Sequence, residues 1–225
     1  MFEILFKAFH SGRTVSMLIV LMTSLVVTNQ SFGADRVIGL TKEAKNLASW
    51  IVSSLDHQQL PFIVVDKRAA KIFVFLADGN LHGSAAALLG VTPGDDTAPG
   101  VGKKKLADIS VAERTTPAGR FVADLGLDLQ NSEILWVDYD SGLSLHVVPT
   151  AVASERRLQR LASVQPADLR ITYGCINVSK QFYKDFVYPT FKNTSGIVYI
   201  LPEVHSIQKV FGAQAANHEY RQRLH

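Results

Sequence analysis

Short apolar segments separated by turn residues fill the middle of this 225-residue chain and limit most how it can fold. Asp78-Gly79 and Asp140-Ser141-Gly142 favour tight turns, and the polar stretch Thr92 to Lys105 is typical of a loop. The apolar segments are rich in β-branched and aromatic residues, as strands are. They are Phe62 to Val65, Lys71 to Leu76, Leu81 to Leu89, Ile134 to Tyr139, Leu143 to Val148 and Ile197 to Leu201. The pattern predicts a mainly β fold, an antiparallel sheet, sandwich or barrel of short strands.

Three segments with helical signals flank these strands. From Thr41 to about Leu55 apolar residues recur every three or four positions, which predicts an amphipathic helix. Ser154 to Ser163 is a short helix candidate with Ser154 as N-cap. Ser179 to Phe191 is another, with Ser179 at its start and Pro189 expected to disturb it. The fold class is therefore mainly β with a few flanking helices.

Composition supports one domain with a buried core. The chain is 47% hydrophobic and 19% charged, with 15 Gly and 8 Pro, which excludes intrinsic disorder and low complexity. The formal net charge of +3 is scattered along the chain, so no nucleic-acid partner is expected.

Cys175 is the single cysteine of the chain. One cysteine excludes an intramolecular disulfide framework and any site that needs several cysteines. The seven His form no HExxH motif or paired ligand spacing, so neither a metal nor a cofactor is expected. Cys175 is then either an inert buried thiol or a reactive one.

Residues 1–33 are typical of a secretory signal peptide. Lys7, His10 and Arg13 give a basic start, the apolar stretch from Met17 to Val27 is shorter than the ~20 residues that span a bilayer, and Ser31 and Gly33 suit cleavage. An uncleaved N-terminal anchor is the alternative. Export to the periplasm or cell envelope favours a reactive Cys175, because exported proteins seldom keep an idle free thiol.

The residues around Cys175 fit nucleophilic catalysis. The segment Ile171 to Val178 leads into the helix expected at Ser179, and a thiol just before a helix start is favoured as thiolate. Gly174 allows close backbone approach, and the N–H groups near Cys175 are candidate oxyanion donors. His146, at the end of an expected strand, is the candidate base, with His82 as its rival.

Three strings resemble a known family. They are Thr172-Tyr173-Gly174-Cys175-Ile176-Asn177, the segment Thr115 to Phe121, and the opening Ile63 to Phe75. Together they resemble the L,D-transpeptidase (YkuD-type) catalytic domain over roughly Pro61 to Pro202. The resemblance implies Cys175 as nucleophile, His146 as general base, Thr172 and Gly174 as residues shaping the site, and Asn177 at a position usually filled by Arg or Asn. Tyr173 either lines the acyl pocket, as its motif position favours, or packs in the core.

The sequence departs from that family at three points. Tyr173 replaces the usual second His, Val147 replaces the Gly that usually follows the catalytic His, and 28 residues separate His146 from Cys175. The extra length is the segment from Arg156 to Pro166, which predicts an inserted helix over the site. Its Arg156, Arg157 and Arg160 are candidates to clamp a substrate carboxylate, or else they form a solvated helix face.

One further motif is rejected. The stretch from Gly100 to Lys103 is superficially similar to a phosphate-binding loop, but Thr97 stands where the first Gly belongs and Lys104 where Ser or Thr should bind magnesium. A surface loop is expected there.

The expected organisation is a signal peptide (1–33), a helical lead-in (34–60), a catalytic domain (61–202) and a C-terminal tail (203–225) that is frayed or forms a loosely docked helix. The residues themselves predict nucleophilic thiol catalysis with an assisting imidazole. The resemblance implies acyl transfer on peptidoglycan stem peptides through a Cys175 thioester, with an amine or an outer-membrane or wall-anchored protein as acceptor. Alternatives are an L,D-carboxypeptidase or a hydrolase releasing wall-attached peptide or protein at the same site, and a catalytically silent peptidoglycan-binding module.

Overall fold

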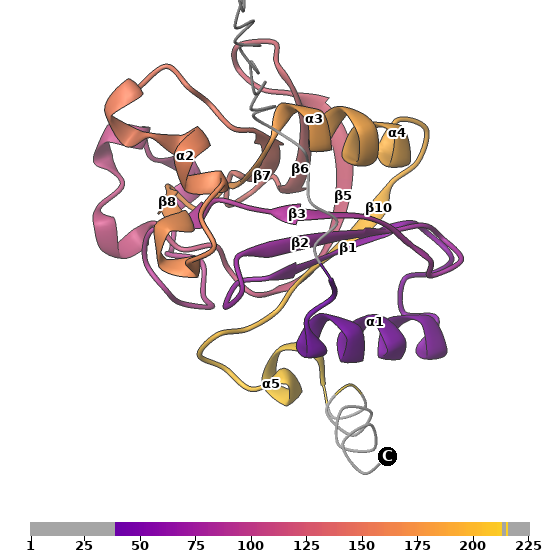
Figure 1. Cartoon of the computed structure of the whole chain (residues 1–225). Coiled ribbons are helices and arrows are strands. Elements are labelled where there is room, and N and C mark those ends of the chain that lie inside the picture. The colour runs from indigo at the N-terminus through magenta and orange to yellow at the C-terminus, as the bar shows by residue number, and fades with distance from the viewer. Residues whose placement is uncertain (1–38, 213–214, 216–225) are drawn as a thin grey trace, which may run out of the picture. The chain divides into compact units, whose positions relative to one another are not determined.

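The computed structural model describes residues 39–212 and residue 215 (Figure 1), so the expected signal peptide lies outside the described residues. The strands are β1 (Phe62–Asp66), β2 (Lys71–Phe75), β3 (Leu81–Ala86), β4 (Leu89–Gly90), β5 (Gly119–Leu127), β6 (Glu133–Asp138), β7 (Leu143–Val147), β8 (Arg170–Thr172), β9 (Ile176–Val178) and β10 (Gly196–Ile200). The helices are α1 (Lys42–Ser54), α2 (Arg157–Leu161), α3 (Lys180–Phe182), α4 (Tyr188–Phe191) and α5 (Ile207–Phe211), and a π-helical turn, Tyr183–Val187, joins α3 to α4. Short 3-10 turns occupy Val101–Lys103, Leu106–Asp108, Val111–Glu113, Ala153–Glu155 and Pro166–Leu169.

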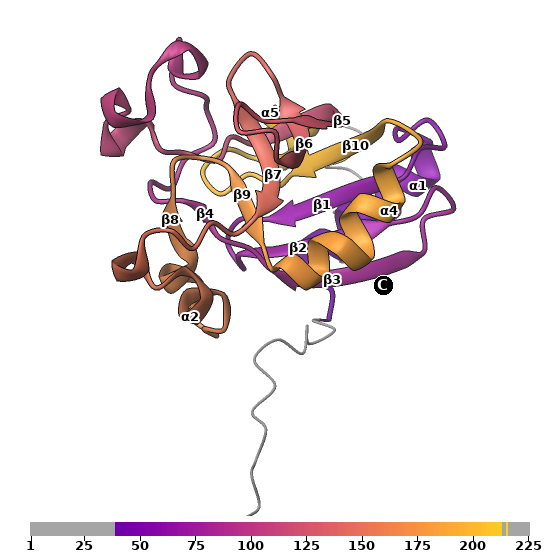
Figure 2. The same cartoon turned by 90° about the horizontal axis from the view of Figure 1, so that it is seen from above.

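Eight of the strands form one strongly curled sheet in the order β3-β2-β1-β10-β5-β6-β7-β9. A bridge between Leu88 and Asn177 brings the end of the β3 segment to β9, so the sheet nearly closes into a barrel (Figure 2). The expected mainly β class with a few flanking helices is confirmed. The expected antiparallel pattern is wrong in part, because β1 pairs with β10, β7 with β9 and β4 with β8 in parallel.

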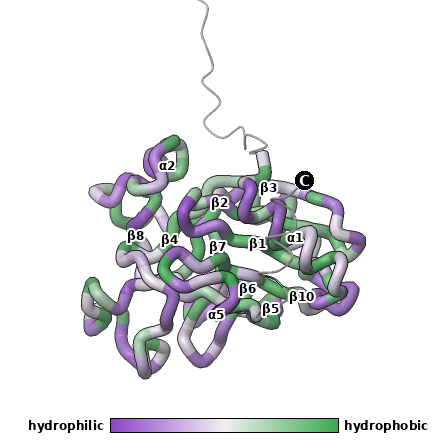
Figure 3. Tube along the Cα trace, turned by 90° about the horizontal axis from the view of Figure 1, so that it is seen from below, coloured by the Kyte–Doolittle hydropathy of each residue, from purple (hydrophilic) through white to green (hydrophobic). Residues whose placement is uncertain are grey.

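The strand sequences are apolar on both sides because both faces of the sheet are covered. In β1, Ile63 and Val65 point into the barrel core, while Phe62 and Val64 face the second core beneath α1. All five β1 residues are buried, which explains its unbroken apolar run. Figure 3 shows hydrophobic residues along β1, β7 and β10 and hydrophilic ones in many of the loops.

The helix expected from Thr41 is confirmed as α1. The Thr41 hydroxyl accepts a hydrogen bond from the Ala44 N–H at 3.2 Å, and Leu55 ends the helix in the left-handed conformation with φ 56°. Leu47 and Ile51 are buried against the outer face of the sheet. The helix therefore covers the face that the barrel core does not fill.

The helices near the site differ from expectation in detail. Ser154 caps no α-helix, because a 3-10 turn at Ala153–Glu155 precedes α2 and Arg156 has φ 52° between them. Ser179 does cap α3, accepting from the Phe182 N–H at 3.0 Å. The π-helical turn lies directly before α4, whose second residue, Pro189, has no N–H to donate.

Two strand predictions also change. The segment from Leu81 to Leu89 divides into β3 and β4, and β5 has no counterpart among the predicted strands. Arg120, Asp124 and two glycines interrupt the β5 sequence, so it lacks a clear apolar alternation.

A buried ion cluster ties four distant segments together. Lys67 Nζ lies 2.6 Å from Asp95 Oδ1 and 3.6 Å from Glu203 Oε1, and Arg170 pairs with Glu203. The side chains of Lys67 and Asp95 are fully buried. The cluster thus joins the β1–β2 turn, the long loop after β4, β8 and the segment after β10.

No helix within the described part of the chain has the length and apolar character needed to cross a membrane. Of the expected tail, α5 is described and Phe211 packs near Tyr199, with ring centroids 6.2 Å apart. Most residues after α5 lie outside the described part.

Candidate active site

Cys175 sits in the tight turn between β8 and β9. Gly174 has φ 128°, and a Cβ there would lie 2.9 Å from the Thr115 carbonyl oxygen, so this position requires glycine. The Thr172 hydroxyl donates to the Cys175 carbonyl at 2.6 Å and accepts from the Gly174 N–H at 3.1 Å. Thr116 donates to the Gly174 carbonyl at 2.6 Å. These two buried hydroxyls fix the turn that carries the thiol.

The helix expected at Ser179 is present as α3, but the expectation that the thiol lies just before a helix start is wrong. Cys175 precedes strand β9, and α3 begins only at Lys180, so no helix dipole acts directly on the thiol. Its polar neighbours belong instead to β7 and the turn before it. The thiol lies 3.5 Å from Ser144 Oγ, which donates to it, and 3.6 Å from the Gly142 carbonyl, which accepts from it.

Parallel pairing of β7 with β9 brings His146 to the thiol. His146 pairs in register with Asn177, and Leu145 with Ile176. Ser144 and His146 lie on one face of β7 because side chains alternate along a strand. The same face of the neighbouring β9 segment carries Cys175 and Asn177. The structure thus places the candidate nucleophile beside the candidate base.

Cys175 and His146 each stabilise the charged form of the other. Burial acts to raise the pKa of the Cys175 thiol, but hydrogen bonding and electrostatic attraction to His146, with help from Ser144, lower it below its ordinary value. Burial and the positive charge of Arg157 act to lower the pKa of His146. The hydrogen bond and attraction to Cys175, together with the Val147 carbonyl, outweigh them and raise it. Both shifts favour a thiolate–imidazolium pair.

Asn177 and Arg157 lie behind His146. Asn177 is 1% exposed, with Nδ2 2.9 Å from His146 Nε2 and Oδ1 2.8 Å from Arg157 Nη1. Arg157 is 8% exposed and pairs with Glu155 at 2.6 Å. Arg157 therefore does not lie on a solvated helix face, whereas Arg156 is exposed. Arg160 binds the carbonyls of Glu155 and Asp168 and holds the inserted segment together.

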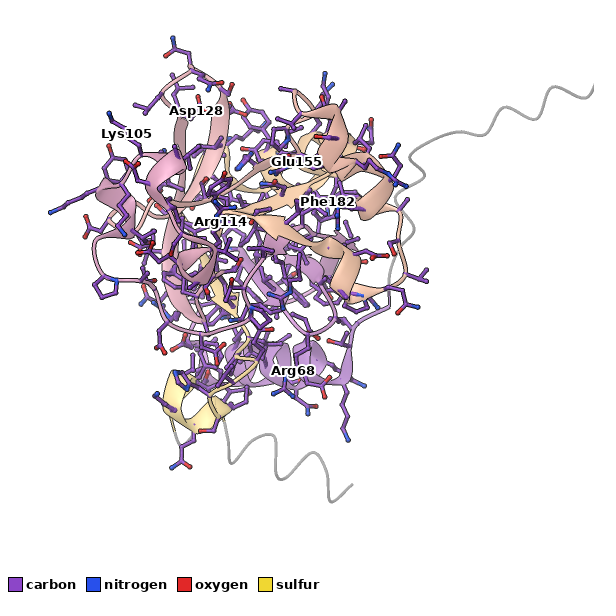
Figure 4. All side chains as sticks on the ribbon, turned by 90° about the vertical axis from the view of Figure 1, so that its left-hand side faces the viewer. Arg68, Lys105, Arg114, Asp128, Glu155 and Phe182 are labelled. Atoms are coloured by element: carbon purple, nitrogen blue, oxygen red, sulfur yellow. The ribbon has the colours of Figure 1, made fainter. Side chains whose placement is uncertain are left out.

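A cleft opens beside Cys175. Its walls are the loop of residues 92–118, the β6–β7 turn at Ser141 and Gly142, and the turn with Tyr173 and Gly174. The Arg114 guanidinium stacks on the Tyr173 ring, 4.0 Å from its centroid. Figures 1 and 2 both place this loop and α2 at the same end of the barrel, and Figure 4 looks onto that side with Arg114 and Glu155 labelled.

The role of this loop is not evident from the sequence, which predicts an ordinary surface loop at Gly100 to Lys103. Val101, Gly102 and Lys104 line the cleft. A Cβ at Gly102 would lie 2.2 Å from the Asp140 carbonyl oxygen, so the missing side chain lets the loop contact the β6–β7 turn. The sequence feature that could have indicated this role is the length of the loop, because long loops in a compact domain are often functional.

The rival base, the oxyanion donors and the potential metal ligands remain to be placed. His82 is exposed on β3 and packs against Phe186, with ring centroids 5.3 Å apart, so it is not part of the Cys175 cluster. The Gly174 N–H is already bonded to Thr172, which leaves the Cys175 N–H as the better oxyanion candidate. Among residues 39–212 and 215, no group of three or more His, Cys, Asp or Glu side chains is arranged to hold a metal ion.

Neither protein-family models nor curated proteins gave a match to this sequence. Solved structures similar to the chain include an L,D-transpeptidase from Mycobacterium smegmatis, 18% identical with a TM-score of 0.36, over 63% of this chain and 58% of that one. Another is an L,D-transpeptidase from Stackebrandtia nassauensis, 14% identical with a TM-score of 0.39, over 77% and 70%.

A third is the helical cell shape determining protein Pgp2 from Campylobacter jejuni, 11% identical with a TM-score of 0.42, over 83% of this chain and 66% of that one. The chain covers less than two thirds of the first of these structures. At such low identities and scores, the function proposed next rests on the residues of this chain and on their resemblance to the family motif.

Proposed function

We propose that this protein is an exported cysteine acyltransferase that acts on peptidoglycan stem peptides through a Cys175 thioester. The observation that carries the proposal is the pairing of His146 with a half-buried Cys175 thiol that lines a cleft. The substrate class comes from the sequence resemblance, and the chemistry comes from the site.

In the first step, His146 Nε2 takes the thiol proton and the Cys175 sulfur attacks a peptide carbonyl carbon. The Cys175 N–H stabilises the oxygen, which gains negative charge. The imidazolium then returns its proton to the leaving amine as the C–N bond breaks, and a thioester remains. His146 Nδ1 lies 2.9 Å from the Val147 carbonyl, which orients the ring during both proton transfers.

In the second step, the amine of an acceptor attacks the thioester carbon and gives its proton to His146. The C–S bond breaks, the thiol is restored and a new amide forms. The acceptor is a second stem peptide or a wall-attached or outer-membrane protein.

Cleft residues provide the groups that select the substrate. Lys104 and Glu113 form an ion pair at the cleft wall, and their charges suit a peptide that carries both amino and carboxylate groups. Tyr173 lines the cleft next to Cys175, and the Arg114 guanidinium stacks on its ring. Thr172 and Gly174 shape the turn, and Asn177 positions His146. Arg156 is exposed on the inserted segment, where it is available to a substrate carboxylate.

The test incubates the purified protein with disaccharide tetrapeptides, with and without a D-amino acid as acceptor, and analyses the products by mass spectrometry. We expect exchange of the terminal residue in the wild type and none in Cys175→Ala or His146→Gln. His82→Gln is the matched control, because this histidine lies outside the cluster, and it should retain the wild-type rate.

Each other outcome counts against the proposal. Hydrolysis alone at high acceptor concentration would replace transfer by the L,D-carboxypeptidase reaction. A Cys175→Ala variant with undiminished exchange would refute a catalytic thiol and leave the protein as a peptidoglycan-binding module.

A further inference from the structure

Arg157 begins a chain of hydrogen bonds whose direction is set at both ends. A guanidinium has only donors, so the atom of Asn177 that lies 2.8 Å from Arg157 Nη1 must be the amide oxygen. The amide NH₂ therefore faces His146 Nε2, at 2.9 Å. At the far end, the Val147 carbonyl only accepts, so His146 Nδ1 carries a proton and donates it.

This fixed direction defines which tautomer the neutral ring of His146 adopts. The Asn177 amide donates to Nε2, so Nε2 must present its lone pair, and the proton of the neutral ring lies on Nδ1. Nε2 is also the atom that must take the proton from Cys175. Once it is protonated, an N–H of His146 faces an N–H of Asn177, which is an unfavourable contact between two donors.

Asn177 can relieve that contact only by turning its oxygen toward His146. The turn would direct the amide NH₂ at the Arg157 guanidinium, which has no acceptor. The conflict would then move to a buried arginine whose other partner, Glu155, is already bonded. Arg157 thus makes protonation of His146 costly in either orientation of the amide.

We propose that Arg157 is a positioning residue of this site, which locks the Asn177 amide toward His146 Nε2 and so restrains proton transfer from Cys175 to His146. The inference rests on the proposed function for its reacting pair. It assigns a role to the inserted segment, because Arg157 is the first residue of α2 and the segment between β7 and β8 brings it behind the site.

The electrostatic surroundings agree with this role. The charged or titratable groups that act on His146 are Cys175, which favours its protonated form, and Arg157, which opposes it. Glu155 partly balances Arg157 through their ion pair. The attraction of the thiolate and the restraint by Arg157 therefore act in opposite directions on the same nitrogen.

The experiment compares Arg157→Met with the wild type in two measurements. His146 titration is followed by ring ¹⁵N NMR, and the rate of Cys175 alkylation by iodoacetamide is recorded against pH. In Arg157→Met the amide is free to turn its oxygen to the imidazolium, so His146 should titrate at higher pH. The thiolate is then stabilised, and alkylation near pH 6 should be about tenfold faster than in the wild type.

Two variants separate positioning from folding. Arg157→Lys keeps a positive donor next to Asn177 and should restore a profile close to wild type. Arg160→Met is the matched control, because Arg160 also braces the inserted segment but binds only backbone carbonyls. It should leave both profiles unchanged, even where it lowers the thermal midpoint.

Failure of the role inferred for Arg157 can be distinguished from failure of the proposed acyl-transfer function. An unchanged His146 titration in a folded Arg157→Met variant overturns this inference, and so does an equal shift in Arg160→Met. A wild-type protein that transfers no acyl group refutes the proposed function, while the NMR titration still tests the role of Arg157.

Discussion

At the scale of single residues, burial of the Cys175 thiol disfavours its charged form, and specific neighbouring side chains stabilise that form. Cys175 is half-buried, which disfavours a thiolate, yet His146 and Ser144 lower its pKa. Thr172 performs a different task, because its hydroxyl satisfies two backbone groups inside the turn. Substitutions at His146 and Thr172 should therefore affect different properties.

His146→Gln should change the pH profile of Cys175 alkylation without unfolding the protein. Loss of the imidazole removes the main interaction that lowers the pKa of the thiol, so its pKa rises. Iodoacetamide labelling at pH 7, followed by intact mass, should be about tenfold slower or more and should approach the wild-type rate at alkaline pH. An unchanged profile would show that His146 does not act on Cys175, and His82→Gln provides the baseline.

Thr172→Val should destabilise the turn while keeping its shape. The variant leaves the Gly174 N–H and the Cys175 carbonyl without their partner, and buried unsatisfied groups cost about 1–3 kcal/mol. Urea unfolding should show this loss, and Thr172→Ser, which keeps the hydroxyl, should recover most of it. Equal stability of the valine and serine variants would contradict the role of the hydroxyl.

At the scale of elements, sequence patterns predict those parts that local rules determine. α1 begins at the cap residue Thr41, and Ser179 caps α3, because a side-chain oxygen near free N–H groups is a local signal. β5 is not predicted because its polar residues and glycines interrupt any alternation of apolar and polar side chains. Its place in the sheet comes from pairing with β10 and β6, which the β5 sequence alone does not encode.

The loop of residues 92–118 should depend on Gly102 for its contact with the β6–β7 turn. In Gly102→Ala the new methyl group would meet the Asp140 carbonyl at 2.2 Å, so the loop must move away. Hydrogen exchange of the loop amides should become faster, and the cleft residues Val101 and Lys104 should be displaced from Cys175.

Gly100→Ala is the matched control for that variant. Gly100 has φ 70°, but a Cβ added there would have no other atom within 4 Å, so alanine adds backbone strain of about 1 kcal/mol without a clash. If both variants accelerate exchange equally, strain rather than contact with the turn explains the effect.

At the scale of the whole molecule, the site depends on pairings between segments far apart in the sequence. The resemblance and the single cysteine indicate Cys175 and His146, but the parallel β7–β9 register that joins them follows from long connections. The same holds for Arg157, whose burial behind Asn177 no local pattern signals. The chemical groups can therefore be found from the sequence, while the support around them requires the fold.

The buried ion cluster makes overall stability sensitive to acid. Burial acts to raise the pKa of Asp95, but Lys67 and the backbone N–H groups of Glu203, Val204 and His205 outweigh it and hold the pKa well below its usual range. Such a carboxylate contributes its full stabilisation above its unfolded pKa of about 4. That contribution is lost as the pH falls through the lower folded value.

We therefore expect the free energy of unfolding in urea to fall as the pH is lowered below about 4. Asp95→Asn should lower it by about 3–5 kcal/mol at pH 7, because Lys67 then keeps a buried charge without its main partner. The variant should also lose much of the acid dependence. Asp96→Asn is the control, since Asp96 is an exposed neighbour and should change little. An Asp95→Asn variant with the wild-type acid slope would show that the cluster does not couple stability to pH.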